Sequence, residues 1–202
     1  MSELDFRVIF VLTYTAFAAV RLRYRLLGPR ERGERRGTGT WGTVLSLLIL
    51  SFFASVSLYL IDHPWVEPFQ GLYPVYLRWV GLGSSISIIP LLIWTHRTLG
   101  GQYSATLRLI EGHALVVEGP YRGTRHPLYT IFWSFGTSVS LVTGNLLLVA
   151  LSLVLIIPLY FISIEEERMM LGRFGEDYRD YMERTGRFLP RIGRTKYKAV
   201  RP

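Results

Sequence analysis

The chain of 202 residues contains no cysteine, and this absence removes several kinds of chemistry at once. Without a thiol the chain has no disulfide framework, no thiolate metal site and no cysteine nucleophile. Histidine is also scarce, and His63, His96, His113 and His126 are too widely spaced to form the ligand pairs of a zinc site. We therefore expect no metal centre.

Charged residues are scarce as well, at 19% of the chain, whereas half of all residues are hydrophobic and 14% are aromatic. In a soluble domain, about a quarter of all residues are usually charged. The charges that are present are unbalanced, with a formal net charge of +8, which would favour nucleic-acid binding in a chain of ordinary apolar content. The high apolar content instead predicts an integral membrane protein without a nucleic-acid partner.

Five apolar runs approach the roughly 20 residues that a helix needs to cross a bilayer. The predicted spanning helices are Phe6–Arg21, Trp41–Ile61, Tyr73–Trp94, Leu128–Thr143 and Leu146–Ile164. Only Gly144 and Asn145 separate the last two runs, which predicts a tight antiparallel hairpin. The predicted fold class is therefore an all-α integral membrane protein with five transmembrane helices and a C-terminal helical hairpin. A soluble helical protein with buried helices is the alternative, but it would leave these runs without a polar face.

The positions of the basic residues predict how the chain lies in the membrane. Segments 22–40, 96–127 and 165–202 hold six, four and ten of the 23 basic residues, and the segments between the runs on the other side hold none. Basic residues collect on the cytoplasmic side of membrane proteins. We therefore expect a multi-pass protein whose three basic segments lie on the cytosolic side. The active site is expected on the same side.

The segment Gly119–Tyr129 combines turn-forming residues with cations and aromatics directly before the fourth run. Pro127 disfavours helical backbone at the preceding residue, so His126 is expected in an extended turn at the start of that helix. An imidazole held there can present a ring nitrogen to a ligand. Alternatively, Arg125 and His126 are interfacial side chains that reach toward water from a helix end.

Three consecutive carboxylates, Glu165–Glu167, follow the fifth run without an intervening glycine or proline. The helix is predicted to continue through them, so that their side chains cover about 200° of its circumference. At least one should then face the bundle, where a carboxylate is costly without a cation or hydrogen-bond donor and indicates function. The alternative is a solvated acidic collar at the helix end.

Apolar and aromatic residues continue beyond the carboxylates at helical spacing, at Met170, Phe174, Tyr178 and Tyr181, with charged residues between them. This pattern predicts a cytosolic amphipathic helix that lies on the membrane or caps the site.

Several short motifs follow one another in a set order over roughly Leu99–Ile192, nearly half of the chain. They are His113-Ala-Leu-Val, Gly119-Pro-Tyr, Arg125-His-Pro-Leu-Tyr, Glu165-Glu-Glu, Phe174-Gly-Glu-Asp-Tyr-Arg-Asp-Tyr and Arg187-Phe-Leu-Pro. This ordered set resembles the isoprenylcysteine carboxyl methyltransferase family, which belongs to a wider group of integral-membrane methyltransferases that includes phospholipid N-methyltransferases. The first three runs resemble that family only in length and topology.

The resemblance implies S-adenosylmethionine as methyl donor, together with a lipophilic small molecule or prenylated peptide that enters from the membrane lipid as acceptor. It implies catalytic roles for Glu166, His126 and Arg125. The cofactor contacts that it implies are His113, Ala114, Leu115, Val116, Tyr121, His126, Pro127, Leu128, Tyr129 and Glu166. Within a single membrane domain, 1–202, we distinguish helices one to three (1–98), the cofactor-binding methyltransferase region (99–192) and a basic tail (193–202).

One position departs from the family pattern and leaves the acceptor open. Ile162 stands one helical turn before Glu166, where related enzymes often have an arginine that is implied to hold the acceptor carboxylate. Arg78, Arg97 and Arg125 are candidates to replace it, or the acceptor is a phospholipid amine or a small thiol. An NADPH-dependent reductase of the sterol type and a non-catalytic membrane scaffold are the remaining alternatives.

Overall fold

The computed structural model describes residues 2–27, 39–100 and 115–191, and within these ranges every regular element is a helix. The elements are α1 (Glu3–Leu27), α2 (Gly39–Leu60), the 3-10 helix η1 (Glu67–Phe69), α3 (Val75–Leu99), the 3-10 helix η3 (Gly119–Arg122), α4 (Pro127–Val142), α5 (Leu146–Val154), α6 (Ile156–Phe174) and α7 (Glu176–Arg184). The predicted all-α class is confirmed.

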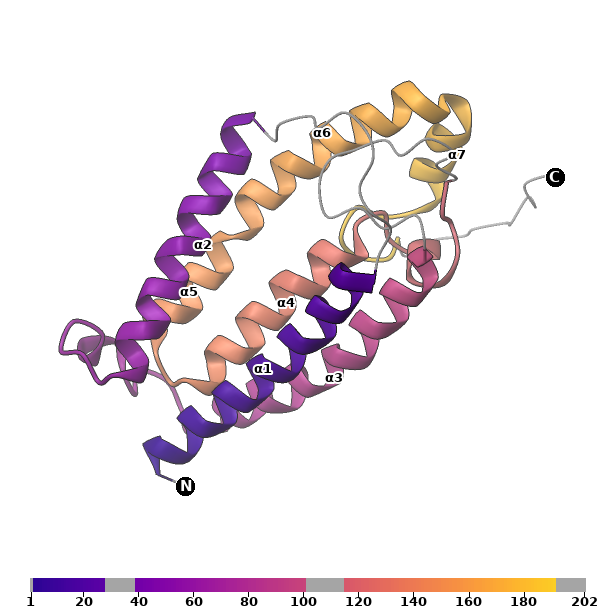
Figure 1. Ribbon diagram of the computed structural model, residues 1–202. Helices are drawn as coiled ribbons and strands as arrows, with labels where there is room; N and C mark the ends of the chain where they lie inside the picture. The colour runs from indigo at the N-terminus through magenta and orange to yellow at the C-terminus, as the bar shows by residue number, and fades with distance from the viewer. Residues whose placement is uncertain (1, 28–38, 101–114, 192–202) are drawn as a thin grey trace.

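The long helices form two groups that lie side by side (Figure 1). Helices α1, α3 and α4 pack on one another, whereas α2 packs along α5 and α6, and α4 contacts α5 to join the groups. The interior is rich in aromatic rings, with Phe17 of α1 stacked on Phe135 of α4 at 3.7 Å between ring centroids. Chain segments far apart in sequence are thereby held in one bundle.

Helical structure is present in each of the five predicted spans. Only three helices in the described part of the chain, however, are long and apolar enough to be identified as candidate membrane spans. In the described ranges, α2, α3 and the combined stretch Leu146–Phe174 are long and apolar enough to cross a membrane. Helix α4 has 16 residues, about 24 Å at 1.5 Å per residue, which is shorter than a hydrocarbon core of about 30 Å. The chain is thus an integral membrane protein, and a count of five spanning helices stays a prediction.

The predicted hairpin between the fourth and fifth runs is present. Gly144 adopts a φ of +72°, which a residue with a Cβ rarely does. The side chain of Asn145 then accepts hydrogen bonds from the N–H groups of Leu147 and Leu148 and so caps α5. Its amide nitrogen also donates to the Val66 carbonyl at 2.9 Å, which attaches the turn to the segment after α2.

The predicted fifth helix is interrupted near Leu155 and continues beyond Ile164. Helix α5 stops at Val154 and α6 begins at Ile156. Pro158 has no N–H to donate to the Val154 carbonyl four residues earlier, which accounts for the break. Helix α6 then continues through the three carboxylates to Phe174, as the sequence predicted for that stretch.

The predicted amphipathic helix is divided into two, which corrects the expectation of one continuous element. Gly175, with a φ of +54°, ends α6, and its N–H closes that end by donating to the Leu171 carbonyl at 2.9 Å. The chain turns there, and α7 buries Tyr178 and Tyr181 against the rest of the molecule. The helix is thereby placed over the carboxylate-bearing end of α6 (Figure 1).

Candidate active site

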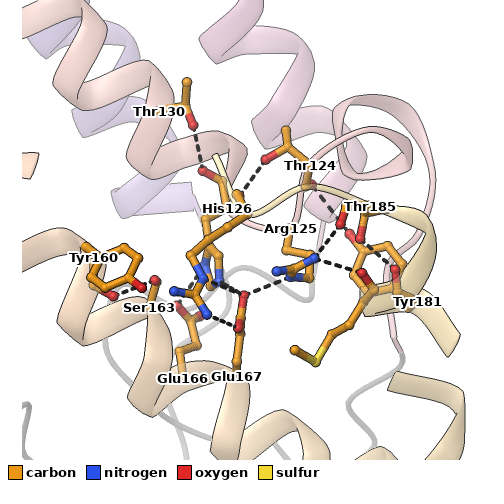
Figure 2. A network of polar contacts seen from close by, with 12 residues as sticks. Thr124, Arg125, His126, Thr130, Tyr160, Ser163, Glu166, Glu167, Tyr181 and Thr185 are labelled. Carbon is orange, nitrogen blue, oxygen red and sulfur yellow. Dashed lines mark hydrogen bonds and ion pairs between the residues drawn. The ribbon is translucent and has the colours of Figure 1, made fainter. Parts of the chain in front are cut away.

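Three segments meet at one end of the bundle. They are the turn before α4, which contains Arg125 and His126, the part of α6 that carries Glu165–Glu167, and the chain that follows α7. Figure 2 shows Glu166 and Glu167 of α6 pointing toward Arg125 and His126 of the turn. The network joins residues about 40 and 60 positions apart in sequence. The candidate site is therefore a product of the tertiary fold.

Glu167 lies at the centre of this network, with only 4% of its side chain exposed. Its Oε1 accepts a hydrogen bond from Nε of Arg125 at 2.7 Å and lies 3.2 Å from Nε2 of His126. Arg187 donates to both carboxylate oxygens, from Nε at 3.1 Å and from Nη2 at 2.7 Å. A buried carboxylate is costly unless it is paired in this way.

Arg125 connects Glu167 to the end of α7. Its Nη1 donates to the carbonyl of Met182 at 3.1 Å and to the carbonyl of Thr185. Each charge-assisted bond of this kind is stronger than a neutral one. The guanidinium thus fixes the relative positions of the turn, α6 and α7.

His126 lies between the two carboxylates. Its Nδ1 is 3.3 Å from Oε2 of Glu166, and its other ring nitrogen faces Glu167. Burial alone would lower the pKa of His126, but its hydrogen bonds and charge interactions with Glu166 and Glu167 outweigh burial, and the pKa is raised above its ordinary value. The imidazole is therefore held in a setting that favours its charged form.

Glu166 is the more exposed of the two carboxylates, at 33% of its side chain. Its Oε2 is nevertheless buried, and its contact with Nδ1 of His126 at 3.3 Å is longer than an ordinary hydrogen bond. A buried carboxylate oxygen can accept more than one hydrogen bond. Beyond the His126 ring, this atom can therefore accept a hydrogen bond from a further donor group.

Aromatic rings lie next to these charges. The Tyr129 ring stacks on His126 with an interplanar angle of 4°. Burial and the charge of Glu166 raise the pKa of Tyr121 well above its ordinary value, which disfavours the phenolate. The hydroxyl of Tyr181 on α7 donates to the Tyr121 carbonyl at 2.6 Å. Flat apolar surface and carboxylate charge are thus combined in one place.

The chain after α7 is hydrogen-bonded along the turn before α4. The N–H groups of Arg125 and His126 donate to the carbonyls of Gly186 and Arg187 at 2.9 and 3.0 Å. The hydroxyl of Thr130 donates to the Phe188 carbonyl at 2.8 Å. We call residues 186–188 the C-terminal clamp.

Most of the predicted site residues that the structure describes are gathered here. Arg125, His126 and Glu166 belong to the network, and Tyr129 stacks on His126. Tyr121 is hydrogen-bonded to Tyr181, and Pro127 and Leu128 follow His126 at the start of α4. Leu115 and Val116 are half-buried in the segment that leads to η3 and take no part in the polar network. His113 and Ala114 lie outside the described residues. No group of three or more His, Asp or Glu side chains suited to a metal ion occurs among the described residues.

The site-residue prediction left out Glu167 and Arg187. The run of three glutamates contained the first, but the sequence alone does not say which of them faces inward. The motif Arg187-Phe-Leu-Pro contained the second, and its distance from Glu167 along the chain hid their pairing.

The three arginines considered for the acceptor occupy different places. Arg78 lies at the opposite end of the bundle, where its side chain donates to Glu3 at 2.8 and 2.9 Å and to the Val142 carbonyl at 2.8 Å. Arg97 is exposed near the end of α3. Only Arg125 lies in the site, and it is engaged with Glu167 and two carbonyls of the chain around the end of α7.

The fold and the site together define an all-helical membrane protein with a buried charged network at one end of its bundle. Residues 79–172 match the model of the isoprenylcysteine carboxyl methyltransferase (ICMT) family, and the resemblance inferred from the sequence motifs is thereby confirmed. The matched residues include the turn with His126 and the three glutamates. The C-terminal clamp lies beyond them.

Individual relatives agree with this match. The chain is 35% identical over 91 residues to a protein-S-isoprenylcysteine O-methyltransferase of Tribolium castaneum, covering 40% of this chain and 29% of that protein. It is 26% identical over 159 residues to the nickel-cobalt-cadmium resistance protein NccN of Alcaligenes xylosoxydans xylosoxydans, covering 78% of this chain and 66% of the relative.

A solved structure of the eukaryotic intramembrane Ras methyltransferase ICMT is similar in fold, with a TM-score of 0.56 at 22% sequence identity. The match covers 73% of this chain and 52% of that one. The chain thus spans between about a third and two thirds of the length of the proteins that it matches.

Proposed function

We propose that this protein is a membrane methyltransferase that uses S-adenosylmethionine and O-methylates the carboxylate of an isoprenylcysteine-type lipophilic acceptor. The observation that carries the proposal is the buried Oε2 of Glu166, which lies 3.3 Å from Nδ1 of His126 and can accept a further hydrogen bond, within the segment that matches the ICMT family. An anionic oxygen flanked by aromatic surface suits a cationic ligand with an aromatic base.

The residues of the site fit this donor. When bound, S-adenosylmethionine supplies a methyl group attached to a positively charged sulfur. Glu166 Oε2 would accept a hydrogen bond from an ammonium or ribose hydroxyl, and the His126 ring with the Tyr129 ring stacked on it would line the pocket together with Tyr121, Pro127 and Leu128. We propose that Leu115 and Val116, together with the preceding His113 and Ala114, also contact S-adenosylmethionine.

The remaining charged residues would act by positioning. A carboxylate acceptor is already ionised at neutral pH, so the chain needs to supply no base. Alignment of the reacting groups can contribute up to about 7–11 kcal/mol in well-oriented systems, and exclusion of water strengthens it. Arg125 and Glu167 would hold His126 and Glu166 in place for this purpose.

The acceptor would reach the site from the bilayer, on the cytosolic side predicted by the basic residues. Ile162 is 3% exposed and offers no charge to an acceptor carboxylate, which keeps a phospholipid amine or small thiol as the alternative acceptor. An amine must lose a proton before attack, and Glu166 would then be the candidate base.

Ligand binding to the purified protein in detergent tests the donor site. Glu166→Gln keeps the shape of the side chain and removes its charge, and the loss of a charge-assisted hydrogen bond should weaken S-adenosylmethionine binding about ten- to a hundredfold. His126→Ala should weaken it as well, whereas Glu176→Gln, an exposed carboxylate on α7, should leave it unchanged. Unchanged affinity in both site variants would contradict the proposal, and tighter binding of NADPH than of S-adenosylmethionine would favour a reductase.

Transfer of a radiolabelled methyl group tests the acceptor. A prenylated cysteine carboxylate should be labelled faster than a phospholipid amine or a tail-less thiol, because each buried methylene contributes about 0.8 kcal/mol to binding. Faster labelling of the water-soluble thiol would exclude entry from the bilayer.

A further inference from the structure

Arg187 has a guanidinium edge that Glu167 does not occupy. An arginine side chain has two edges that can each bind an oxyanion in a bidentate manner. Glu167 occupies the edge formed by Nε and Nη2. The edge formed by Nη1 and the second N–H of Nη2 is not engaged by Glu167.

The neighbour of this second edge is the aromatic residue Tyr160. The Arg187 guanidinium lies over the Tyr160 ring, with its carbon 4.8 Å from the ring centroid. Tyr160 belongs to the same turn of α6 as Ile162, and it is 44% exposed on a helix that is apolar enough to span a membrane. The guanidinium therefore lies between the buried network and the exposed surface of α6 at Tyr160.

The surrounding structure fixes the position of Arg187 and determines how far its charge is neutralised. Its carbonyl accepts from the N–H of His126 and from the hydroxyl of Thr124 at 2.7 Å, so the backbone is fixed next to the site. Its side chain is 23% exposed, compared with 4% for Glu167. Glu167 is shared by two arginines and His126, and Glu166 also faces His126. With His126 protonated, the network has three cations and two carboxylates, so an anion beside Arg187 would balance the charge.

We infer that Arg187 forms the binding site for the carboxylate of the methyl acceptor, supplying from the C-terminal clamp the cation that Ile162 does not supply from α6. The inference rests on the proposed function and names the group that recognises the acceptor. The acceptor carboxylate pairs with the edge of Nη1 and Nη2, and its apolar tail extends past Tyr160 into the bilayer. Arg187 is thus a specificity-determining residue, whereas Arg125 is a positioning residue.

The experiment compares two ligands that differ in charge alone. An N-acetyl-S-prenylcysteine and its primary carboxamide have the same tail, and their affinities are measured on the full chain with S-adenosylhomocysteine bound, so that no transfer occurs. The wild-type protein should bind the carboxylate about ten- to a hundredfold more tightly than the carboxamide. Arg187→Gln should reduce this preference to near one.

Two further variants separate recognition from folding. Arg179→Gln removes an exposed arginine of α7 that pairs only with Glu176 among the described residues, and it should keep the wild-type preference. Arg187→Lys keeps the charge that pairs with Glu167 but cannot present two bidentate edges, so the preference should fall at least severalfold. If Arg187→Gln does not fold, the carboxylate preference of Arg187→Lys tests the inference instead.

The outcomes distinguish the inference from the proposed function. Equal weakening of both ligands in the Arg187 variants would mean that the guanidinium acts only through Glu167, and the inference would be wrong. The same conclusion follows if the wild-type protein binds S-adenosylmethionine but does not prefer the carboxylate. If the wild-type protein binds no S-adenosylmethionine, the proposed function itself fails.

Discussion

Neighbouring residues with the same side chain have different environments in this site. Glu167 is buried and bound by two arginines, whereas Glu166 is partly exposed and its Oε2 faces Nδ1 of His126 at 3.3 Å. The difference follows from helix geometry, because consecutive side chains point about 100° apart. We therefore expect Glu167 to matter first for stability and Glu166 first for ligand binding.

Glu167→Gln should destabilise the protein much more than Glu166→Gln. Removing one member of a buried ion pair typically costs roughly 3–5 kcal/mol, since the remaining charge is left uncompensated. For a chain of this size 1 kcal/mol corresponds to about 2–4 °C in Tm. Thermal unfolding followed by tryptophan fluorescence should show a decrease of several degrees for Glu167→Gln. Equal Tm values for the two variants would contradict the central role of Glu167.

The raised pKa of His126 predicts how its contribution to stability depends on pH. A histidine whose pKa is higher in the folded protein contributes fully below its unfolded value of about 6.5, and the contribution is lost as the pH rises through the folded value. The difference in Tm between the wild-type protein and His126→Gln should therefore be largest near pH 6 and decrease toward alkaline pH. His63→Gln, at the other end of the bundle, serves as the control. A difference that grows with pH would have the wrong sign.

At the scale of elements, the C-terminal clamp and the turn before α4 behave as one unit. Their backbones are paired by the N–H groups of Arg125, His126 and Gly186, and the clamp carries Arg187 into the network. The break at Gly175 makes this possible, because a straight continuation of α6 would carry α7 and the clamp away from His126. The site thus depends on elements outside the segment that matches the ICMT family.

Gly186→Ala should weaken S-adenosylmethionine binding by distorting the clamp. A Cβ at this position would lie 1.8 Å from the Leu189 carbonyl oxygen, so the backbone has to move. Gly172→Ala is the matched control, since a Cβ there meets no atom within 4 Å. Titration of both variants should show weaker binding for Gly186→Ala alone. Equal affinities would mean that the clamp does not close the donor site.

At the scale of the whole molecule, the two ends of the bundle have different chemistry. The site end contains the charged network, whereas the other end is held by Arg78 with Glu3 and by the ion pair of Arg7 with Asp62. Arg78 connects α1, α3 and the end of α4, and its guanidinium also lies 3.6 Å from the Phe6 ring centroid. This far end thereby fixes the relative positions of the helices that hold the site.

Cysteine labelling can test the predicted orientation in the membrane without background, because the chain has no thiol of its own. A cysteine in place of the exposed Glu176 should react with an impermeant reagent only from the cytosolic side. A cysteine in place of the exposed Glu67, at the opposite end, should react only from outside. Labelling of both positions from one side would contradict the predicted topology.

Local patterns in the sequence were sufficient to predict the helices, the hairpin at Gly144 and Asn145, and the family resemblance. Apolar run length, turn residues and motif order are properties of neighbouring residues, so they can be read without coordinates. The breaks at Leu155 and Gly175 had local signals too, in Pro158 and in a glycine after the last periodic residue.

Pairing between distant segments was decided by the tertiary structure alone. The sequence placed three glutamates on a helix and predicted that one would face inward, but the rotation of α6 against the turn before α4 determined that Glu167 is buried and that Glu166 is partly exposed beside His126. Arg187 meets Glu167 only because α7 folds back, and Arg78 is carried to the far end by the packing of α3 on α1. Helical periodicity sets the angle between side chains within one helix, whereas the identity of the partner across the bundle depends on how separate helices pack.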